Sequence, residues 1–154
     1  MTSLSAKVIQ AMQGRTLATA ESCTGGMIGQ MLTDVAGSSA VFKGGIISYC
    51  NDVKEELLGV SRNLLDEAGP VSASVAQEMA SGARAALHTD VAVSVTGLAG
   101  PGGDEFGNPV GTVFIGYSDE QCCISNKYEF QGDRAQIRQQ AASCALMLIL
   151  EHNS

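Results

Sequence analysis

The sequence is poor in the residues on which several common catalytic and binding classes depend. It contains two histidines, and both are expected at the surface: His88 at the end of a helix and His152 in the C-terminal tail. A Ser-His-Asp mechanism or a histidine-based metal site is therefore disfavoured. Nine basic residues face sixteen acidic ones, no run of Lys or Arg occurs, and the formal net charge is −7. This balance disfavours nucleic acid as a partner.

The five cysteines include no C-x-x-C pair, and their odd number fits neither a disulfide framework nor a zinc site. They indicate a reducing compartment, so we expect a cytoplasmic protein. The N-terminal residues lack the basic region and cleavage site of a leader peptide. The longest apolar run near the end, ALMLIL at residues 145–150, is too short to cross a bilayer. We therefore expect no membrane partner.

Two nucleotide-binding fingerprints are also missing. The P-loop pattern G-x-x-x-x-G-K-[ST] does not occur, and neither does G-x-G-x-x-G. The glycine-rich stretch GLAGPGG at residues 97–103 leads into an expected strand rather than a helix. The sequence thus predicts neither of these folds, and it suggests no cofactor and no metal.

Hydrophobic spacing predicts alternating helices and strands without linkers or repeats, which indicates one domain over residues 1–154. Helices are expected near residues 4–13, 27–35, 52–59, 61–67 and 72–88, and from Asp133 onward. Strands are expected at Thr16–Ala20, Val41–Cys50, Asp90–Thr96, Val110–Tyr117 and Ile124–Phe130. Asn51 or Asp52 is expected to cap the third helix, with Glu55 completing a capping box after Asp52. This order predicts an α/β fold with a mixed sheet and helices on both faces.

The segment AESCTGG at residues 20–26 offers three candidate nucleophiles in a row, Ser22, Cys23 and Thr24, between an expected strand and helix. The free N–H groups of a helix N-terminus can hold a phosphate or an oxyanion. Gly25 and Gly26 would let a ligand approach the backbone, and a thiol at this place is expected to have a lowered pKa. An ordinary helix cap by Ser or Thr accounts for the same local sequence.

A serine nucleophile needs a base, and with histidines badly placed a neutral lysine is the candidate. Lys54 follows the second expected strand within the first turn of a helix. In a parallel sheet this places it at the same edge as AESCTGG. Tyr49, five residues earlier, is placed to orient a group or relay a proton there. A solvated lysine and a half-buried tyrosine are the alternative interpretation.

Two further segments are candidates for holding an anion. The loop after the third expected strand contains Gly97 and Gly100, whose backbone N–H groups can face a ligand, and Thr96 at the strand end is a possible donor. Arg134 stands in the first turn of the last helix, where the helix dipole disfavours a cation, and Arg138 follows one turn later. A phosphate would explain this placement, and a salt bridge would explain it equally.

Four ordered motifs, AESCTGG, SYCNDVK, SVTGLAGPGG with PVGTV, and GDRAQIR, resemble the C-terminal domain of competence/damage-inducible protein A. The resemblance covers about residues 4–150. Stand-alone members are nicotinamide-nucleotide amidohydrolases. It implies a three-layer α/β/α sandwich with a mixed, mostly parallel five-stranded sheet, and it implies homo-oligomers. The larger family form carries a further N-terminal domain, whose activity is not expected here.

The resemblance implies hydrolysis of the carboxamide of nicotinamide mononucleotide to nicotinate mononucleotide and ammonia, in pyridine nucleotide salvage. It implies Ser22 as nucleophile and Lys54 as general base, supported by Tyr49. The substrate-binding residues are expected to be Cys23, Thr24, Gly25, Gly26, Thr96, Gly97, Gly100, Arg134 and Arg138. The alternative is a non-catalytic nucleotide- or phosphate-binding module linked to competence or the DNA-damage response, for which Lys54 and Tyr49 would not be needed.

Overall fold

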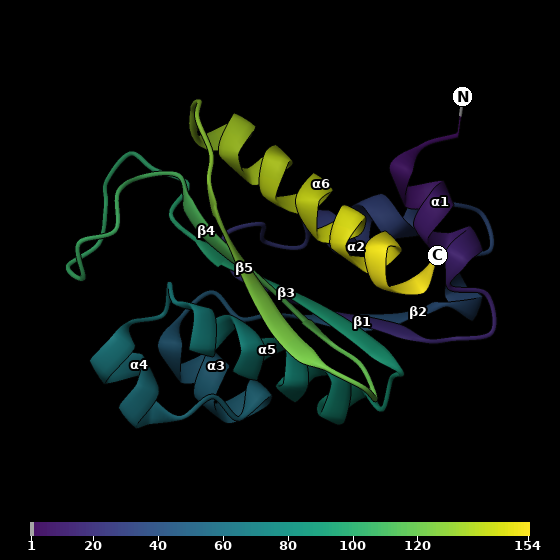
Figure 1. The fold of residues 1–154 in the computed structure, drawn as a ribbon, viewed down its shortest axis with the longest axis horizontal. Helices are drawn as coiled ribbons and strands as arrows, with labels where there is room; N and C mark the ends of the chain where they lie inside the picture. The colour runs from purple at the N-terminus through teal and green to yellow at the C-terminus, as the bar shows by residue number, and fades with distance from the viewer. Residues whose placement is uncertain (1) are drawn as a thin grey trace.

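The computed structural model of the chain describes residues 2–154, which form a five-stranded sheet in the order β2-β1-β3-β4-β5 (Figure 1). The strands are β1 Leu17–Glu21, β2 Phe42–Ile47, β3 Val91–Gly97, β4 Thr112–Ser118 and β5 Cys123–Glu129. β1 pairs in parallel with β2 and β3, whereas β4 is antiparallel to β3 and β5. β4 therefore runs against the direction of the other strands. This arrangement confirms the expected mixed, mostly parallel sheet.

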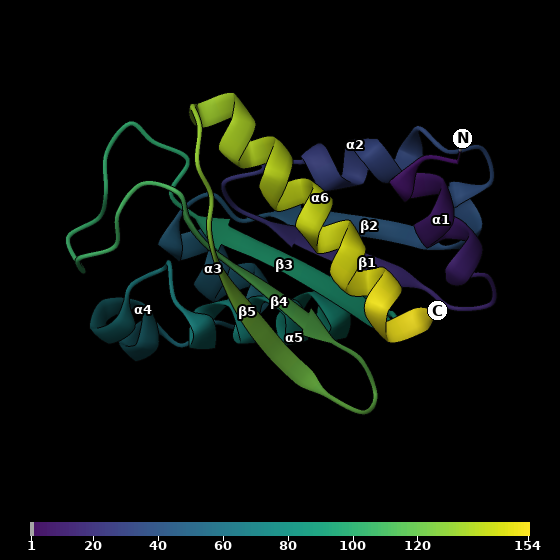
Figure 2. The same cartoon turned by 45° about the horizontal axis from the view of Figure 1, so that its top comes forward.

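Helices cover both faces of the sheet, as the sequence predicts (Figure 2). One face carries α1 Leu4–Ala11, α2 Met27–Thr33 and α6 Arg134–Asn153. The other carries α3 Asn51–Leu58, α4 Arg62–Ala68 and α5 Ala73–Leu87. A short 3₁₀ turn, Ser38–Ala40, precedes β2. Within residues 2–154, no helix combines the length and hydrophobicity that a bilayer crossing requires.

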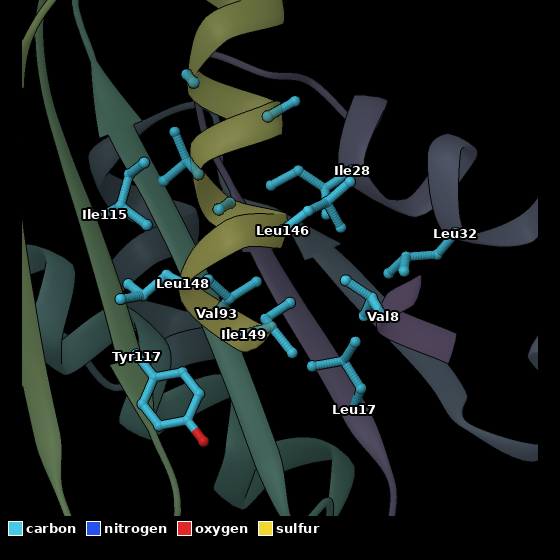
Figure 3. Packing of buried hydrophobic residues seen from close by; sticks show 14 of the residues in the cluster. Val8, Leu17, Ile28, Leu32, Val93, Ile115, Tyr117, Leu146, Leu148 and Ile149 are labelled. Atoms are coloured by element: carbon cyan, nitrogen blue, oxygen red, sulfur yellow. The ribbon is translucent and has the colours of Figure 1, made fainter. Parts of the chain in front are cut away.

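The larger core lies beneath α6, where large aliphatic side chains of three helices meet the sheet (Figure 3). It includes Val8, Leu17, Ile28, Leu32, Val93, Ile115, Tyr117, Leu146, Leu148 and Ile149. The smaller core beneath α5 meets the sheet through alanines, among them Ala18, Ala20 and Ala92. β1 is buried along its whole length because it is covered on both faces.

The end of β2 and the start of α3 differ from the sequence prediction. β2 ends at Ile47, so residues 48–50 leave the sheet before the helix begins. Cys50 is the N-cap residue of α3 and makes no side-chain capping bond, so the predicted capping box is wrong. The carboxylates of Asp52 and Glu55 are instead paired with Arg62. At α6 the prediction is confirmed, because Asp133 caps the helix in a capping box.

The topology brings several strand ends to one place. After β1 the chain turns to α2 on one face of the sheet, and after β2 it turns to α3 on the other (Figure 2). Neighbouring parallel strands whose continuations diverge in this way leave a crevice at their carboxyl ends, where ligands of open α/β sheets collect. Glu21 is in register with Ile47 and with Val95. The residues that follow these three therefore lie side by side at the crevice.

The close approach of α5 to α3 depends on Gly82. A Cβ atom at this position would run into the main-chain carbonyl of Leu58 at the end of α3. We expect Gly82→Ala to push the helices apart and to destabilise the fold by about 1–3 kcal/mol, the usual cost of overpacking. Urea unfolding measures the change, with Ser81→Ala, an exposed neighbour on α5, as the control. Equal stability of the two variants would contradict this account of the contact.

Candidate active site

The site is organised around Glu21, the last residue of β1, whose side chain is 2% exposed. Its two carboxylate oxygens accept hydrogen bonds from the hydroxyls of Thr19 and Thr24 and from the main-chain N–H groups of Gly26, Ile28 and Gly29. The negative charge lies against the N-terminus of α2, where free N–H groups favour an anion. Glu21 therefore does within the chain what a bound phosphate does at other helix N-termini.

The turn between Glu21 and α2 is held from two sides. Gly25 and Gly26 have φ values of +59° and +105°, a conformation that favours glycine. From α6, the guanidinium of Arg138 donates to the main-chain carbonyls of Cys23 and Thr24, at 2.9 and 3.1 Å. The turn is thus fixed by hydrogen bonds within the protein before any ligand binds.

Four residues expected to contact substrate belong to this support. Thr24 is fully buried and donates its hydroxyl to Glu21. The N–H of Gly25 is bonded to the carbonyl of Ser22, and that of Gly26 to Glu21. Neither glycine lines the cavity described below, and neither Thr24 nor Arg138 does. The side chains of Thr24 and Arg138 and the N–H groups of both glycines thus hold the turn, and contact of these four residues with a substrate stays a prediction.

Ser22 and Lys54 are brought together as the sequence predicts. The amine Nζ of Lys54 lies 3.1 Å from Ser22 Oγ and 2.7 Å from the main-chain carbonyl oxygen of Ser48. Ser22 is anchored by its own N–H, which donates to the carbonyl of Val95 on β3. The Lys54 side chain is 2% exposed. A buried amine in hydrogen-bond contact with a serine hydroxyl is the arrangement that a Ser-Lys mechanism requires.

Burial lowers the pKa of Lys54 to about 8, although the nearby thiols of Cys50 and Cys23 act in the opposite direction. Burial removes the water that would otherwise hydrate the ammonium ion, so the neutral amine is favoured. A neutral amine donates one N–H to the Ser48 carbonyl and can turn its lone pair toward the Ser22 hydroxyl. Lys54 can therefore serve as a base near neutral pH.

Cys23 is a poor candidate for the nucleophile. Burial raises the pKa of its thiol to about 11, so the expectation of a lowered pKa is wrong. The effect of the helix N-terminus is outweighed because the thiol sits in an apolar cluster. Its main-chain N–H, like that of Thr24, donates to no other residue within residues 2–154. Cys23 lines the cavity, and its N–H is thus a candidate donor to an oxyanion.

A cavity of about 290 Å³ opens beside Ser22 and Lys54. The polar side chains that line it are those of Ser22, Tyr49, Asn51, Lys54, Thr96 and Arg134. Pro70, Val71, Leu98 and Ala99 form an apolar wall, and Gly97 and Gly100 also line the cavity. No Asp or Glu in the described part of the chain lines it, and that part holds no group of three metal-ligating side chains. The cavity is therefore positively charged through Arg134 and any protonated Lys54.

Arg134 and Tyr49 stand at the mouth of this cavity. Arg134 donates through Nη1 to the carbonyl of Gly100 at 2.6 Å, and through Nη2 to the hydroxyl of Tyr49 at 3.2 Å. Tyr49 is 63% exposed and makes this bond rather than one with Ser22 or Lys54. The geometry therefore favours a role for Tyr49 in positioning Arg134 over a role as a proton relay.

The apolar wall is fastened by hydrogen bonds from β3 and the following loop. The hydroxyl of Thr96 donates to the carbonyl of Pro70 at 2.7 Å, and the side-chain amide of Asn108 donates to the carbonyl of Val71 at 3.3 Å. Thr96 thus lines the cavity as expected, while its hydroxyl hydrogen is used to hold the wall. The wall gives an apolar surface to the cavity that Ser22 and Lys54 also line.

Sequence reasoning missed Glu21, Asn51 and the wall residues Pro70 and Val71. An acidic residue at the end of an apolar strand, directly before a helix N-terminus, was an available signal for Glu21. For Asn51 the signal was its position three residues before Lys54, which places both on one helix face. Pro70 and Val71 had no such signal, because they come from the connection between α4 and α5 and reach the site only through the fold.

The fold and the site define a class: a three-layer α/β/α domain with a buried Ser-Lys pair. The pair lies at the carboxyl ends of neighbouring parallel strands whose following helices cover opposite faces of the sheet. The sequence profile of the CinA C-terminal domain matches residues 1–152. The chain belongs to this family.

Individual relatives agree with this assignment. A CinA-like protein of Geobacter sulfurreducens is 52% identical over 134 residues, which is 87% of this chain and 32% of the relative. A putative competence-damage inducible protein of Halothermothrix orenii is 50% identical over 79% of this chain and 30% of the relative. The chain spans about a third of the length of these curated relatives.

Solved structures match almost end to end. The competence/damage inducible protein CihA of Agrobacterium tumefaciens gives a TM-score of 0.94 at 37% identity, covering 98% of this chain and 94% of that one. The competence damage-inducible protein A (ComA) of Klebsiella pneumoniae gives 0.93 at 34% identity, covering 96% and 93%. These structures share the three-layer fold.

Glu21→Gln tests the support of the turn. The variant keeps the shape of the side chain but replaces one acceptor oxygen with an NH₂ group, which faces N–H groups that it cannot satisfy. Hydrogen bonds to a charged group contribute about 1.5–3 kcal/mol each, so we expect destabilisation on the order of 3 kcal/mol. Chemical unfolding measures it, with Glu56→Gln on the exposed side of α3 as a matched control. If the free energy of unfolding falls no more than in the control, the role of Glu21 in supporting the turn is contradicted.

Proposed function

We propose that this chain hydrolyses the carboxamide of nicotinamide mononucleotide to nicotinate mononucleotide and ammonia, a step of pyridine nucleotide salvage. The observation that carries the proposal is the hydrogen bond between Lys54 Nζ and Ser22 Oγ, with the pKa of Lys54 lowered to about 8. Amide hydrolysis needs an activated nucleophile and a group that returns a proton to the departing amine. The choice of substrate rests on the resemblance of the four sequence motifs to nicotinamide-nucleotide amidohydrolases.

In the first step Ser22 Oγ attacks the carboxamide carbon while the neutral Lys54 amine takes the hydroxyl proton. The carbonyl oxygen becomes an oxyanion, and the free N–H of Cys23 is the candidate donor to it. The carbonyl of Ser48 accepts a bond from Nζ throughout and keeps the amine aimed at Ser22. The new C–O bond and the transferred proton leave a tetrahedral intermediate beside a lysine ammonium.

In the second step the Lys54 ammonium protonates the amide nitrogen, the C–N bond breaks and ammonia leaves. An ester between Ser22 and the nicotinoyl group remains. Water then attacks this ester with Lys54 again acting as base, and Ser22 regains its proton as the carboxylic acid is released. One water is consumed for each ammonia formed, and the enzyme returns to its starting state.

The binding end of the cavity suits an anionic substrate. Arg134 reaches the mouth, and no acidic side chain in the described part of the chain lines the cavity. A phosphate would offer Arg134 a charge-assisted bidentate partner in place of the Gly100 carbonyl. The Pro70–Val71 wall offers an apolar surface for an aromatic ring. A pyridine ring and a phosphate on one small molecule meet both conditions.

Ser22→Ala and Cys23→Ala separate the two adjacent nucleophiles. We expect Ser22→Ala to reduce ammonia release from nicotinamide mononucleotide by on the order of a thousandfold or more, as the loss of a nucleophile usually does. Cys23→Ala should retain most of the activity, because its thiol is protonated at neutral pH and only its main chain is required. Ammonia release is measured with each purified, folded variant.

A comparable collapse in Cys23→Ala would assign the attack to the thiol. No ammonia from the folded wild-type protein would reject the amidohydrolase. A non-catalytic phosphate-binding module would then remain, although such a module has no use for the bond between Ser22 and Lys54.

The pH dependence of turnover reports on Lys54. Because the neutral amine is the active form, kcat/KM should rise with pH and level off above about 8, the pKa of this group. Lys54→Arg cannot lose its proton and should be inactive at every pH. Activity that instead falls as the pH rises through 8 would make Lys54 a binding cation rather than the base.

A further inference from the structure

One polar side chain in the cavity makes no hydrogen bond within the described residues. Ser22 is bonded to Lys54, Tyr49 to Arg134, and Thr96 to the Pro70 carbonyl. Asn51 also lines the cavity, and no bond of its side-chain amide within residues 2–154 is found. An amide carries an acceptor oxygen and two donor hydrogens, so this side chain is available in full to a ligand.

Asn51 is the first residue of α3 and stands three residues before Lys54. Residues at this spacing are neighbours on one helix face, with Cβ atoms about 5–6 Å apart. Both side chains reach the same cavity, where Lys54 Nζ meets Ser22 Oγ. A carboxamide placed for attack by Ser22 therefore shares this cavity with the Asn51 amide.

The substrate carboxamide brings two N–H hydrogens into this cavity, and a buried N–H without an acceptor is costly. No carboxylate of the described residues lines the cavity, and the carbonyl of Ser48 already accepts from Lys54. The oxygen Oδ1 of Asn51 is thus an acceptor on a side chain that makes no hydrogen bond within the described residues, whereas the hydroxyls of Thr96 and Tyr49 are each already bonded once. The carboxamide N–H needs an acceptor, and Asn51 Oδ1 is an acceptor without a donor among those residues.

We propose that Asn51 is the specificity-determining residue of the site: its Oδ1 accepts a hydrogen bond from the NH₂ group of the carboxamide that Ser22 attacks. The inference rests on the proposed amidohydrolase function. The bond fixes rotation about the C–N bond, so that the nitrogen lone pair of the tetrahedral intermediate faces the Lys54 ammonium. It favours amides over esters, because an ester offers no N–H to Asn51.

The test compares two substrates, nicotinamide mononucleotide and the methyl ester of nicotinate mononucleotide, in wild type and in Asn51→Ala. We expect kcat/KM for the amide to fall by about tenfold or more, and that for the ester by less than about threefold. Asn63→Ala, the same change at an exposed position on α4, is the control and should change neither. Because Asn51 is only partly buried and makes no bond, Asn51→Ala should unfold at the same temperature as wild type.

Asn51→Asp provides a second readout. It keeps an acceptor oxygen and should preserve the preference for the amide over the ester. The added carboxylate lies one helical turn from Lys54 and favours its ammonium form, so the pH profile should move to higher pH. A merely structural role of Asn51 would not produce this shift together with a retained preference.

The outcomes separate the two proposals. Equal losses for amide and ester in Asn51→Ala, or no loss for either, would overturn the role of Asn51 and leave the amidohydrolase intact. A folded wild-type protein that hydrolyses neither substrate would overturn the proposed function, and with it this inference. A selective loss for the amide supports both.

Discussion

The structure of the site depends on one buried carboxylate. Glu21 ends β1 and accepts hydrogen bonds from three main-chain N–H groups and one hydroxyl at the start of α2, and from the hydroxyl of Thr19 on β1. Without such an acceptor these donors would be buried and unsatisfied, or would need a bound anion. Because Glu21 occupies the helix N-terminus, the turn is held by the protein itself without a bound ligand, and Ser22 faces the cavity rather than α2. Arg138 braces the same turn from α6.

A second constraint concerns charge. Lys54 is buried, and in the described part of the chain no acidic side chain lines its cavity. A carboxylate at this place would hold the lysine as an ammonium ion, useless as a base. The neutral carbonyl of Ser48 orients the amine without stabilising its charge to the same degree. The acidic residues that give the chain its net charge of −7 therefore lie outside the cavity. The charged side chains that line the cavity are basic, whereas the protein as a whole is negatively charged.

Much of this site was predictable because parallel strands share an edge. A strand followed by AESCTGG and a second strand followed by Lys54 place the two segments together once the sheet is parallel. The geometry of parallel strands could not predict the environment of Cys23 or the contacts of Arg138, because both depend on residues that are distant in sequence. Cys23 has a raised pKa because neighbouring apolar side chains remove its solvent. Arg138 contacts the turn and not the cavity, because α6 packs on β3 and β4 beside α2, a position that periodicity alone does not set.

The resemblance of the motifs to a known family implied the pairing of Ser22 with Lys54. The amino-acid sequence by itself determined the order of helices and strands, the layered α/β fold and the shared sheet edge of AESCTGG and Lys54. These follow from hydrophobic spacing, turn residues and the geometry of parallel strands, all of which are local or periodic. Only the tertiary structure decided which polar groups already have partners. It assigned Thr24, Gly25, Gly26 and Arg138 to the support of the turn, and it left Asn51 free in the cavity. Hydrogen-bond saturation and burial are properties of the packed chain, because the atoms that satisfy or desolvate a group come from segments distant in sequence.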